Sequence, residues 1–296
     1  MSTLSVLIET SPCSWGKLSC DHGNRTIGII LRAMVSFCNA HLAQSASNQL
    51  LFFAYGREIE RKMLYSSGRP DDRDFSHLII KRLRDILVDA SSLKNSKKGV
   101  FLSPALAHAF CHMKKDTKPT PNDLCADSLG PQNISSGDSD VSNQPTINRA
   151  VIISITPISG NEHGSLMNLF FSAAKQGICV DVVSMGNDRK RGILQQAADI
   201  TGGLFLHVQQ PDYLLKTLMT NMLSDPVNRN TFFKPRLISV DYRASCICHQ
   251  LMVSSGWVCS VCLAVLCQYT PICTVCKAIF TISSLPKKNK RKRVLQ

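Results

Sequence analysis

The sequence of 296 residues lacks the short motifs that mark common catalytic sites. It contains no GxxxxGK[ST], GxGxxG, HExxH or GxSxG, so nothing indicates a phosphate-binding loop, a dinucleotide site, a zinc protease or a nucleophile elbow. Its eight histidines stand at no recognisable spacing from a nucleophile. We therefore expect a protein that is not an enzyme.

Long apolar runs are also missing. No run approaches the roughly 18 consecutive apolar residues that cross a bilayer, so we expect no membrane protein. Residues 1–16 have no basic start and carry Glu9 within their apolar stretch, which argues against a secretory signal. With 44% hydrophobic and only 19% charged residues, the composition fits one or two globular domains with a sizeable core.

Acidic residues are few relative to basic ones. The chain has 34 Lys and Arg against 21 Asp and Glu, a net charge of +13. Without its last ten residues the net charge is +7, so the body is only mildly basic and its charge alone does not indicate nucleic-acid binding. The tail predicts a nuclear localisation signal and a nuclear protein, a solvated basic end being the alternative. Its basic residues are Lys287, Lys288, Lys290, Arg291, Lys292 and Arg293.

Strand and helix patterns alternate along the first three quarters of the chain. Continuous apolar runs predict buried strands at 4–9, 49–55, 150–155, 178–184 and 204–208. A further strand at 61–65 follows Gly56 and predicts a hairpin. Helical spacing of apolar residues appears at 26–46, 75–90, 103–112, 165–175, 192–201 and 212–223. Strands without polar alternation are buried on both faces, so the prediction is a doubly wound α/β sheet.

Composition divides the chain into four parts. We expect the α/β domain over 1–225, a linker over 226–237, a cysteine-rich module over 238–281 and a basic tail over 282–296. Within the first part, about 114–148 is rich in Pro, Ser, Asp, Asn and Gly. That stretch predicts a disordered surface insertion, because it buries too little surface to offset the entropy of ordering it.

Seven of the thirteen cysteines lie between Cys246 and Cys276. Tight pairs without a signal peptide favour metal thiolates in a reducing compartment over a disulfide scaffold. The strongest pattern is Cys259-x2-Cys262 followed by Cys273-x2-Cys276, which can present four thiolates tetrahedrally to Zn²⁺. Four sulfurs leave no open coordination position, so the predicted zinc site is structural.

A second group of candidate ligands consists of Cys246, Cys248, His249 and Cys267. These residues could form a second zinc site in the cross-braced manner of RING-like modules. Alternatively, they could pack as reduced thiols around the first site. The sequence leaves one ion or two open.

Four stretches of the chain are distinctive. They read GILQQAADITGGL at 192–204, DYRASCICH at 241–249, VCSVCL at 258–263 and PICTVC at 271–276. Together they resemble the 34-kilodalton-class subunit of transcription factor TFIIH. The similarity runs with few gaps from Ala150 to Cys276 and is looser in the N-terminal half. It implies a von Willebrand A-like domain, with helices on both faces of its sheet, followed by a small C-terminal zinc module with four cysteine ligands.

The resemblance also indicates where a magnesium ion would bind in this fold, in the loop after the first strand. Metal-binding members of the wider fold carry Asp-x-Ser-x-Ser in the loop after the first strand, and the matching positions here are Glu9, Ser11 and Cys13. A longer carboxylate and a thiol suit Mg²⁺ poorly, since that ion demands octahedral oxygen ligands. We expect no Mg²⁺ at this loop.

In function, the resemblance implies a non-catalytic structural subunit of the TFIIH core, acting in RNA polymerase II initiation and nucleotide excision repair. Its partners would be the 44-kilodalton sister subunit, other core subunits and, indirectly, the helicases of this nuclear hetero-oligomer. Two other classes stay open. A RING-like ubiquitin ligase or adaptor would need the second zinc site and an apolar groove. A DNA-binding zinc ribbon would need basic residues, yet Gly256 to Phe280 contains only Lys277, so direct nucleic-acid binding is not expected.

Overall fold

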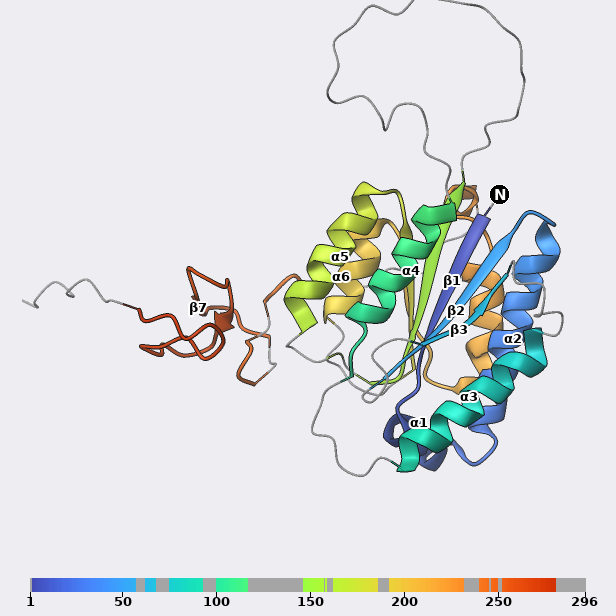
Figure 1. Cartoon of the computed structure of the whole chain (residues 1–296), viewed down its shortest axis with the longest axis horizontal. Coiled ribbons are helices and arrows are strands. Elements are labelled where there is room, and N and C mark those ends of the chain that lie inside the picture. Colours follow the sequence, from blue (N-terminus) through green and yellow to red (C-terminus); the bar gives the residue numbers. More distant parts are fainter. Residues whose placement is uncertain are drawn as a thin grey trace, which may run out of the picture. The chain divides into compact units, whose positions relative to one another are not determined.

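The computed structural model describes most of the chain and divides it into two compact units, Met1–Tyr242 and Arg243–Gln296 (Figure 1). The described residues are 2–56, 62–67, 75–92, 100–116, 146–156, 158, 162–185, 192–231, 240–244, 246–249 and 252–280. Most of the insertion expected at 114–148, and the whole region after 280 with the basic tail, lie outside them. At the margins of the insertion, helix and strand extend to residues 116 and 147.

A six-stranded sheet in the order β3-β2-β1-β4-β5-β6 forms the centre of the first unit. The strands are β1 (Ser2–Glu9), β2 (Gln49–Tyr55), β3 (Lys62–Ser66), β4 (Ile147–Ser154), β5 (Cys179–Ser184) and β6 (Phe205–His207). All neighbouring pairs are parallel except β2 and β3, which form the predicted antiparallel pair at one edge.

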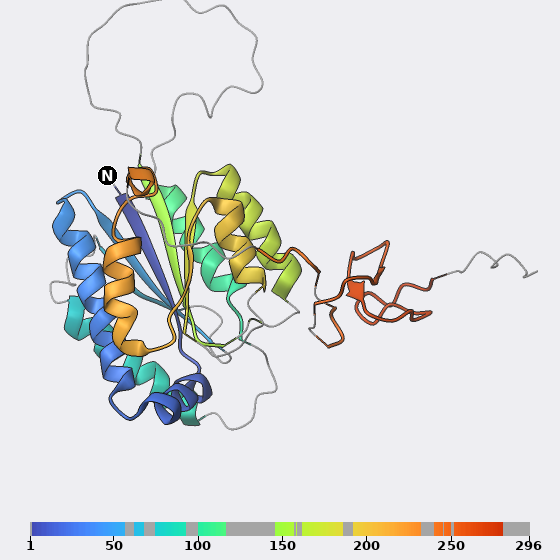
Figure 2. The ribbon, with the colours of Figure 1, turned by 180° about the vertical axis from the view of Figure 1, so that it is seen from behind.

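Helices cover both faces of this sheet, as Figures 1 and 2 show. One face carries α1 (Pro12–His22), α2 (Thr26–Gln44), α3 (Phe75–Ser92) and a last helical segment made of η3 (Pro211–Tyr213), α7 (Leu214–Thr217) and η4 (Leu218–Met222). The other face carries α4 (Ser103–Asp116), α5 (His163–Lys175) and α6 (Gly192–Thr201). Along β1, Val6 and Ile8 pack into the first core and Leu7 into the second, which explains why these three consecutive residues are all apolar.

Helix α2 is the most apolar long helix among the described residues. Its 19 residues are long and apolar enough, by length and composition alone, to qualify as a candidate membrane span. Ile30, Met34 and Phe37 on its inner face are buried in the core that α2 shares with the sheet. The apolar composition of α2 is thus accounted for by packing within the α/β unit.

Helix α1 corrects an expectation from the sequence, because the sequence predicts a loop after β1 and the structure has a helix there. Pro12 stands in the first turn of α1, where the missing N–H of proline costs no hydrogen bond. Trp15 and Leu18, three residues apart, are buried in the same core as α2. The helix therefore starts immediately beyond the end of β1.

Two buried arginines fasten the end of the last helical segment to the sheet. Arg149 of β4 donates to the carbonyls of Met222 (3.0 Å) and Ser224 (2.8 Å). Arg229, in η5 (Asn228–Thr231), donates to the same Ser224 carbonyl (2.9 Å) and pairs with Asp181 of β5. Part of the segment expected as a linker therefore lies inside the first unit.

The second unit contains little regular structure. A short antiparallel hairpin joins β7 (Trp257–Val258) to β8 (Val265–Leu266), and an isolated bridge joins Ile272 to Ile279. Among its described residues, the buried cluster comprises Cys259, Ala264 and Cys273. A core this small gives little hydrophobic stabilisation, so another source of stability has to hold the unit together.

Candidate metal centre

The first CxxC pair forms a tight turn held by two backbone hydrogen bonds. The N–H of Leu263 donates to the carbonyl of Cys259 (2.9 Å), and the N–H of Cys259 donates to the carbonyl of Ala264 (3.0 Å). These bonds close the chain around the pair and point both cysteines to the same side of the turn.

The second CxxC pair repeats that turn. The N–H of Lys277 donates to the carbonyl of Cys273 (3.0 Å), and the N–H of Cys273 donates to the carbonyl of Ala278 (2.8 Å). Leu263 and Lys277, each directly after the second cysteine of its pair, have φ angles of 59° and 63°. This left-handed conformation costs a residue with a side chain roughly 1–2 kcal/mol. Its occurrence at both equivalent positions shows that the two turns share one geometry.

The four sulfurs of these turns meet in one place. The sulfurs of Cys259 and Cys276 lie 3.6 Å apart, as do those of Cys262 and Cys273. All four lie within 4.8 Å of one another. A tetrahedral zinc ion with bonds of about 2.3 Å separates its sulfurs by about 3.8 Å, so the cluster fits such an ion with a small adjustment.

The electrostatics of this cluster also favour a cation. Backbone N–H groups of Cys276 and Val275 lower the pKa of Cys273 to about 6, which makes it a thiolate at neutral pH. The N–H of Ala264 acts in the same direction on Cys262, but burial and the three neighbouring sulfurs outweigh it and raise the pKa of Cys262 to about 12. Four thiolates this close would repel one another, which is why Cys262 holds its proton without a metal, and a divalent cation among the sulfurs would remove that repulsion.

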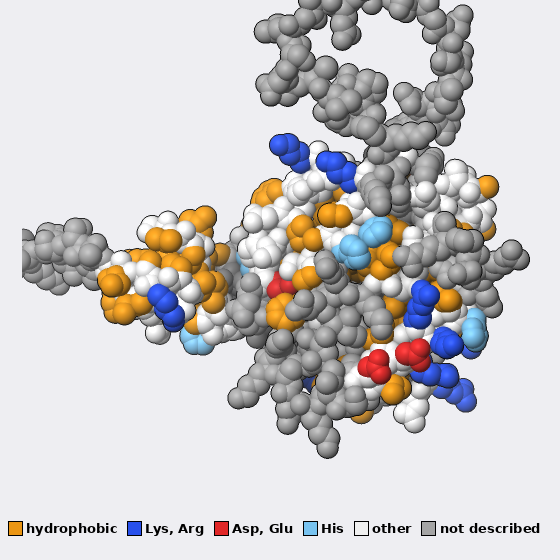
Figure 3. Space-filling view, in the orientation of Figure 1, with side chains coloured by type: hydrophobic (Ala, Val, Ile, Leu, Met, Phe, Trp, Pro, Cys, Tyr) orange, Lys and Arg blue, Asp and Glu red, His pale blue; other side chains and the backbone are white. Residues whose placement is uncertain are grey.

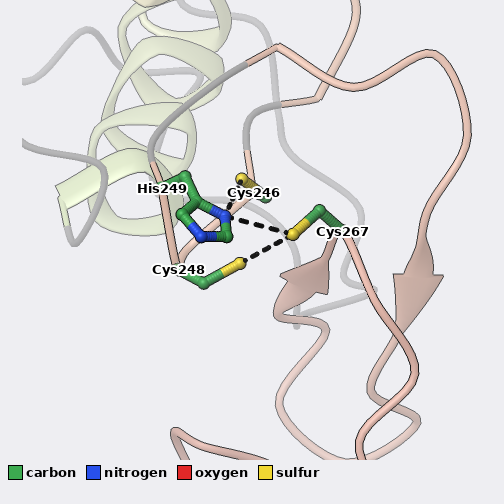
Figure 4. A group of neighbouring side chains, drawn as sticks. All are labelled: Cys246, Cys248, His249 and Cys267. Atoms are coloured by element: carbon green, nitrogen blue, oxygen red, sulfur yellow. Dashed lines mark hydrogen bonds between the residues drawn. The ribbon is translucent and has the colours of Figure 1, made fainter.

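The second group of candidate ligands also converges, as Figure 4 shows. Cys246, Cys248 and His249 come from one turn, and Cys267 directly follows β8. The sulfur of Cys267 lies 3.1 Å from the sulfur of Cys248 and 3.2 Å from Nδ1 of His249, which is 4.0 Å from the sulfur of Cys246. The structure thus brings together the members of both sets that the sequence singled out.

The end of β1 is occupied by protein hydrogen bonds. Glu9 is fully buried, and its carboxylate accepts from the hydroxyls of Ser14 (2.6 Å) and Thr156 (2.6 Å). It also accepts from the backbone N–H groups of Ile155 and Thr156, both at 2.8 Å. These four donors join the end of β1 to α1 and to the residues that follow β4.

The other two residues that match the family's metal motif stand at the start of α1. Ser11 is the N-cap residue of α1, and Cys13 is exposed in its first turn. Ser14 stands beside Glu9 instead. Pro12 was the sequence signal for this helix, whereas Thr156 comes from another strand end and no motif local to β1 could reveal it.

The fold and the cysteine clusters together define a class of protein, a von Willebrand A-like domain joined to a cysteine-rich candidate metal-binding module. The model of the family described as transcription factor Tfb4 matches residues 1–277. The chain belongs to this family, which confirms the resemblance found in the sequence.

Relatives and a solved structure agree with this assignment. General transcription and DNA repair factor IIH subunit tfb4 of Schizosaccharomyces pombe is 28% identical, over 97% of this chain and 91% of that protein. The TFB4 subunit of Kluyveromyces lactis is 30% identical, over 99% of this chain and 89% of that protein. The crystal structure of the TFIIH p34 N-terminal domain matches with a TM-score of 0.56 and 25% identity, covering 74% of this chain and 96% of that one.

Proposed function

We propose that this chain is a non-catalytic structural subunit of the TFIIH core, acting in RNA polymerase II initiation and nucleotide excision repair through protein–protein contacts. The observation that carries the proposal is the family match over residues 1–277, together with relatives that are named as TFIIH subunits. The missing catalytic motifs support a structural role. The comparisons give no support to the ubiquitin-ligase or zinc-ribbon alternatives.

In this proposal Cys259, Cys262, Cys273 and Cys276 hold a structural zinc ion. The support is the pair of matching turns and the fit of the four sulfurs to a tetrahedron. The ion would supply the folding energy that the small core of the second unit does not. Its role is to shape a binding surface, since four thiolates leave no position for a substrate.

The α/β domain, in the same proposal, works without Mg²⁺ at Glu9, Ser11 and Cys13. The support is the set of four donors that already surround the carboxylate of Glu9. A magnesium ion would have to displace these donors, and the thiol of Cys13 does not supply the oxygen ligand that the ion prefers.

We place the contact with the 44-kilodalton sister subunit on exposed apolar side chains of the second unit, whose visible face in Figure 3 carries many hydrophobic side chains. Seven large apolar side chains of this unit are between 50% and 75% exposed, and they are Trp257, Val258, Val261, Leu263, Ile272, Val275 and Ile279. Lys277 is the one charged residue between Gly256 and Phe280. An uncharged surface of this kind suits an apolar protein partner and gives no cations for phosphates.

The test is purification of the tagged chain from nuclear extract in reducing buffer, with the bound proteins identified by mass spectrometry. The sister subunit and other TFIIH core subunits should be recovered with the wild-type chain. Val261→Asp should reduce the recovery of the sister subunit, while Ser255→Asp adds the same charge at an exposed polar position of the unit and should not. Recovery of no TFIIH subunit with the wild-type chain would refute the proposal.

We also propose that the basic tail directs import into the nucleus. Replacing Lys290, Arg291, Lys292 and Arg293 with Ala removes four charges and should make a fluorescent fusion more cytoplasmic. Because a partner could carry the variant into the nucleus, the tail should also be fused to a neutral reporter. An unchanged distribution of both proteins would contradict the tail's role.

A further inference from the structure

We propose that Cys246, Cys248, Cys267 and Nδ1 of His249 bind a second zinc ion, separate from the ion assigned to the two CxxC pairs. All four ligand atoms lie within 4.8 Å of one another. Three thiols and one imidazole are a donor set typical of structural zinc. The proposal does not depend on membership of a complex, because it concerns only ligands of this chain.

The backbone brings these ligands together from two segments. The N–H of Ile247 donates to the carbonyl of Val265 in β8 (2.9 Å), which sets the turn at 246–249 beside that strand. Cys267 follows β8 directly and so reaches the turn. An ion at this place would link the start of the unit to its hairpin by bonds much stronger than this backbone contact.

The histidine ring is oriented for metal binding. Its Nδ1 faces the sulfurs of Cys267 and Cys246, at 3.2 and 4.0 Å, as Figure 4 shows. A metal-bound imidazole is neutral and keeps its proton on the other nitrogen, here Nε2. His249 can therefore supply the nitrogen ligand, while the adjacent Cys248 supplies a sulfur ligand.

The sulfurs of Cys248 and Cys267 are the part of the cluster that must adjust. Their separation of 3.1 Å is shorter than the roughly 3.8 Å expected between two sulfurs on one zinc ion. It is also well beyond the roughly 2.05 Å of a disulfide bond. A zinc site requires the two sulfurs to move apart, whereas a disulfide requires them to move together, so the two outcomes can be told apart.

The two proposed sites alternate along the chain. The ligands at 246–249 belong to the second site, the pair at 259 and 262 to the first, Cys267 to the second, and the pair at 273 and 276 to the first. Each ion therefore closes a loop that contains ligands of the other. When one ion is lost, the loop between the ligands of the other ion becomes less constrained, and closing that loop costs more entropy. The two ions should therefore stabilise each other.

The two sites differ in exposure. Cys259 and Cys273 of the first site are fully buried, whereas Cys248 and His249 of the second site are exposed. A chelator reaches exposed ligands more easily. The second ion should therefore be removed first when a chelator is added stepwise.

The experiment uses the full chain, purified without oxygen in a reducing buffer, and counts zinc by native mass spectrometry. The wild-type chain should carry two zinc ions, and the Cys248→Ser/Cys267→Ser double variant should carry one. The matched control, Cys20→Ser/Cys111→Ser, changes two exposed cysteines of the first unit and should keep both ions. X-ray absorption at the zinc edge should give seven sulfur ligands to one nitrogen for the wild type, and sulfur alone for the first double variant.

One zinc ion per wild-type chain, with sulfur ligands only, would overturn the proposal. So would two ions in the Cys248→Ser/Cys267→Ser variant, or a disulfide-linked peptide joining these residues in the reduced wild-type protein. If the double variant fails to fold, the ratio of sulfur to nitrogen in the wild type still decides the question. None of these outcomes bears on whether the chain assembles into TFIIH.

Discussion

Arg229 and Asp181 form a two-point ion pair inside the first unit, with nitrogen–oxygen distances of 2.7 and 2.6 Å. Asp181 is fully buried in β5 and also accepts a hydrogen bond from the N–H of Leu204 (2.9 Å), directly before β6. The pair thus connects the segment after the last helix with two strands of the sheet. Each charge is stabilised mainly by the other, because both groups are buried and little water reaches them.

The first prediction is that Arg229→Met destabilises the first unit. The substitution leaves the carboxylate of Asp181 buried without its partner, so the free energy of unfolding should fall by about 3–5 kcal/mol. Urea unfolding of the full chain measures this change. Arg32→Met, at an exposed position of α2, is the matched control and should stay within about 0.5 kcal/mol. A loss below about 1 kcal/mol for Arg229→Met would show that the pair is dispensable.

The second prediction concerns Glu9. Glu9→Gln keeps the shape of the side chain but turns an amide N–H₂ toward groups that themselves donate, so the free energy of unfolding should fall by about 2–3 kcal/mol. The measurement is urea unfolding with and without excess magnesium. Magnesium should leave the wild type unchanged. If it stabilised the wild type and not the variant, Glu9 would be a metal ligand after all.

Much of the fold could be predicted because its strands are buried on both faces. Continuous apolar runs such as 49–55 and 150–155 admit few other interpretations, and the helix at 192–201 has the bounds that its pattern indicates. The hairpin beside Gly56 and the doubly wound topology follow from the same patterns. The candidate metal ligands were visible for a similar reason, since CxxC spacing is a local property of the chain.

What the sequence could not show are contacts between distant segments. Thr156 lies next to Glu9 because β1 and β4 are neighbours in the sheet, and no local pattern encodes that pairing. Arg229 falls within the linker that the sequence predicts, because the sequence alone does not distinguish an arginine in a buried ion pair from an exposed one. The convergence of Cys267 with the turn at 246–249 likewise depends on the folded hairpin.

The third prediction is a loss of stability of the first unit at mildly acidic pH. Burial, followed by the charge of Arg149, lowers the pKa of His41 to about 4, although a hydrogen bond to the carbonyl of Gln49 opposes the shift. In the unfolded chain the pKa is about 6.5. Below pH 6.5 the unfolded state therefore binds a proton that the folded state refuses. The stabilisation is complete above pH 6.5 and is lost between pH 6.5 and 4, by about 3 kcal/mol in total.

This pH dependence can be followed in the first unit alone. In a Trp257→Phe background, Trp15 is the remaining tryptophan and reports on the core of the first unit. His41→Gln should flatten the dependence of the urea midpoint on pH between 6.5 and 4. His22→Gln, at an exposed position of α1, should keep the wild-type slope. An equal slope in all three proteins would exclude His41 as the cause.

The fourth prediction is that loss of zinc from the CxxC pairs unfolds the second unit and spares the first. Cys259→Ser/Cys262→Ser removes two of four ligands, so residues from about 243 to 280 should become susceptible to protease. The first unit has its own core and should keep its unfolding midpoint, as reported by Trp15. Cys20→Ser, in α1, is the control for a lost thiol. A protease-resistant second unit in the double variant would contradict a structural role for this zinc.

The last prediction separates the stability of the second unit from its binding function. Leu263 and Lys277 occupy equivalent left-handed positions in the two turns, with φ angles of 59° and 63°. Glycine removes the strain of about 1–2 kcal/mol at such a position. Its greater freedom in the unfolded chain destabilises the folded state by about 0.5–1 kcal/mol, which offsets part of this gain. Leu263→Gly and Lys277→Gly should therefore each leave the unit as stable as before or slightly more stable.

The two glycine variants should differ in their affinity for the sister subunit. Leu263 is 72% exposed, so its large apolar side chain endures a strained backbone without packing into its own unit. In the proposed interface Leu263 is an apolar anchor, and truncating a central anchor often costs about 2 kcal/mol or more of binding free energy, roughly 30-fold in affinity. Leu263→Gly should weaken binding to the 44-kilodalton sister subunit on that scale, whereas Lys277→Gly should change it little. Titration calorimetry with zinc-loaded chains measures both. Equal affinities for the two variants would place the partner's contact elsewhere, because the strain they relieve is the same.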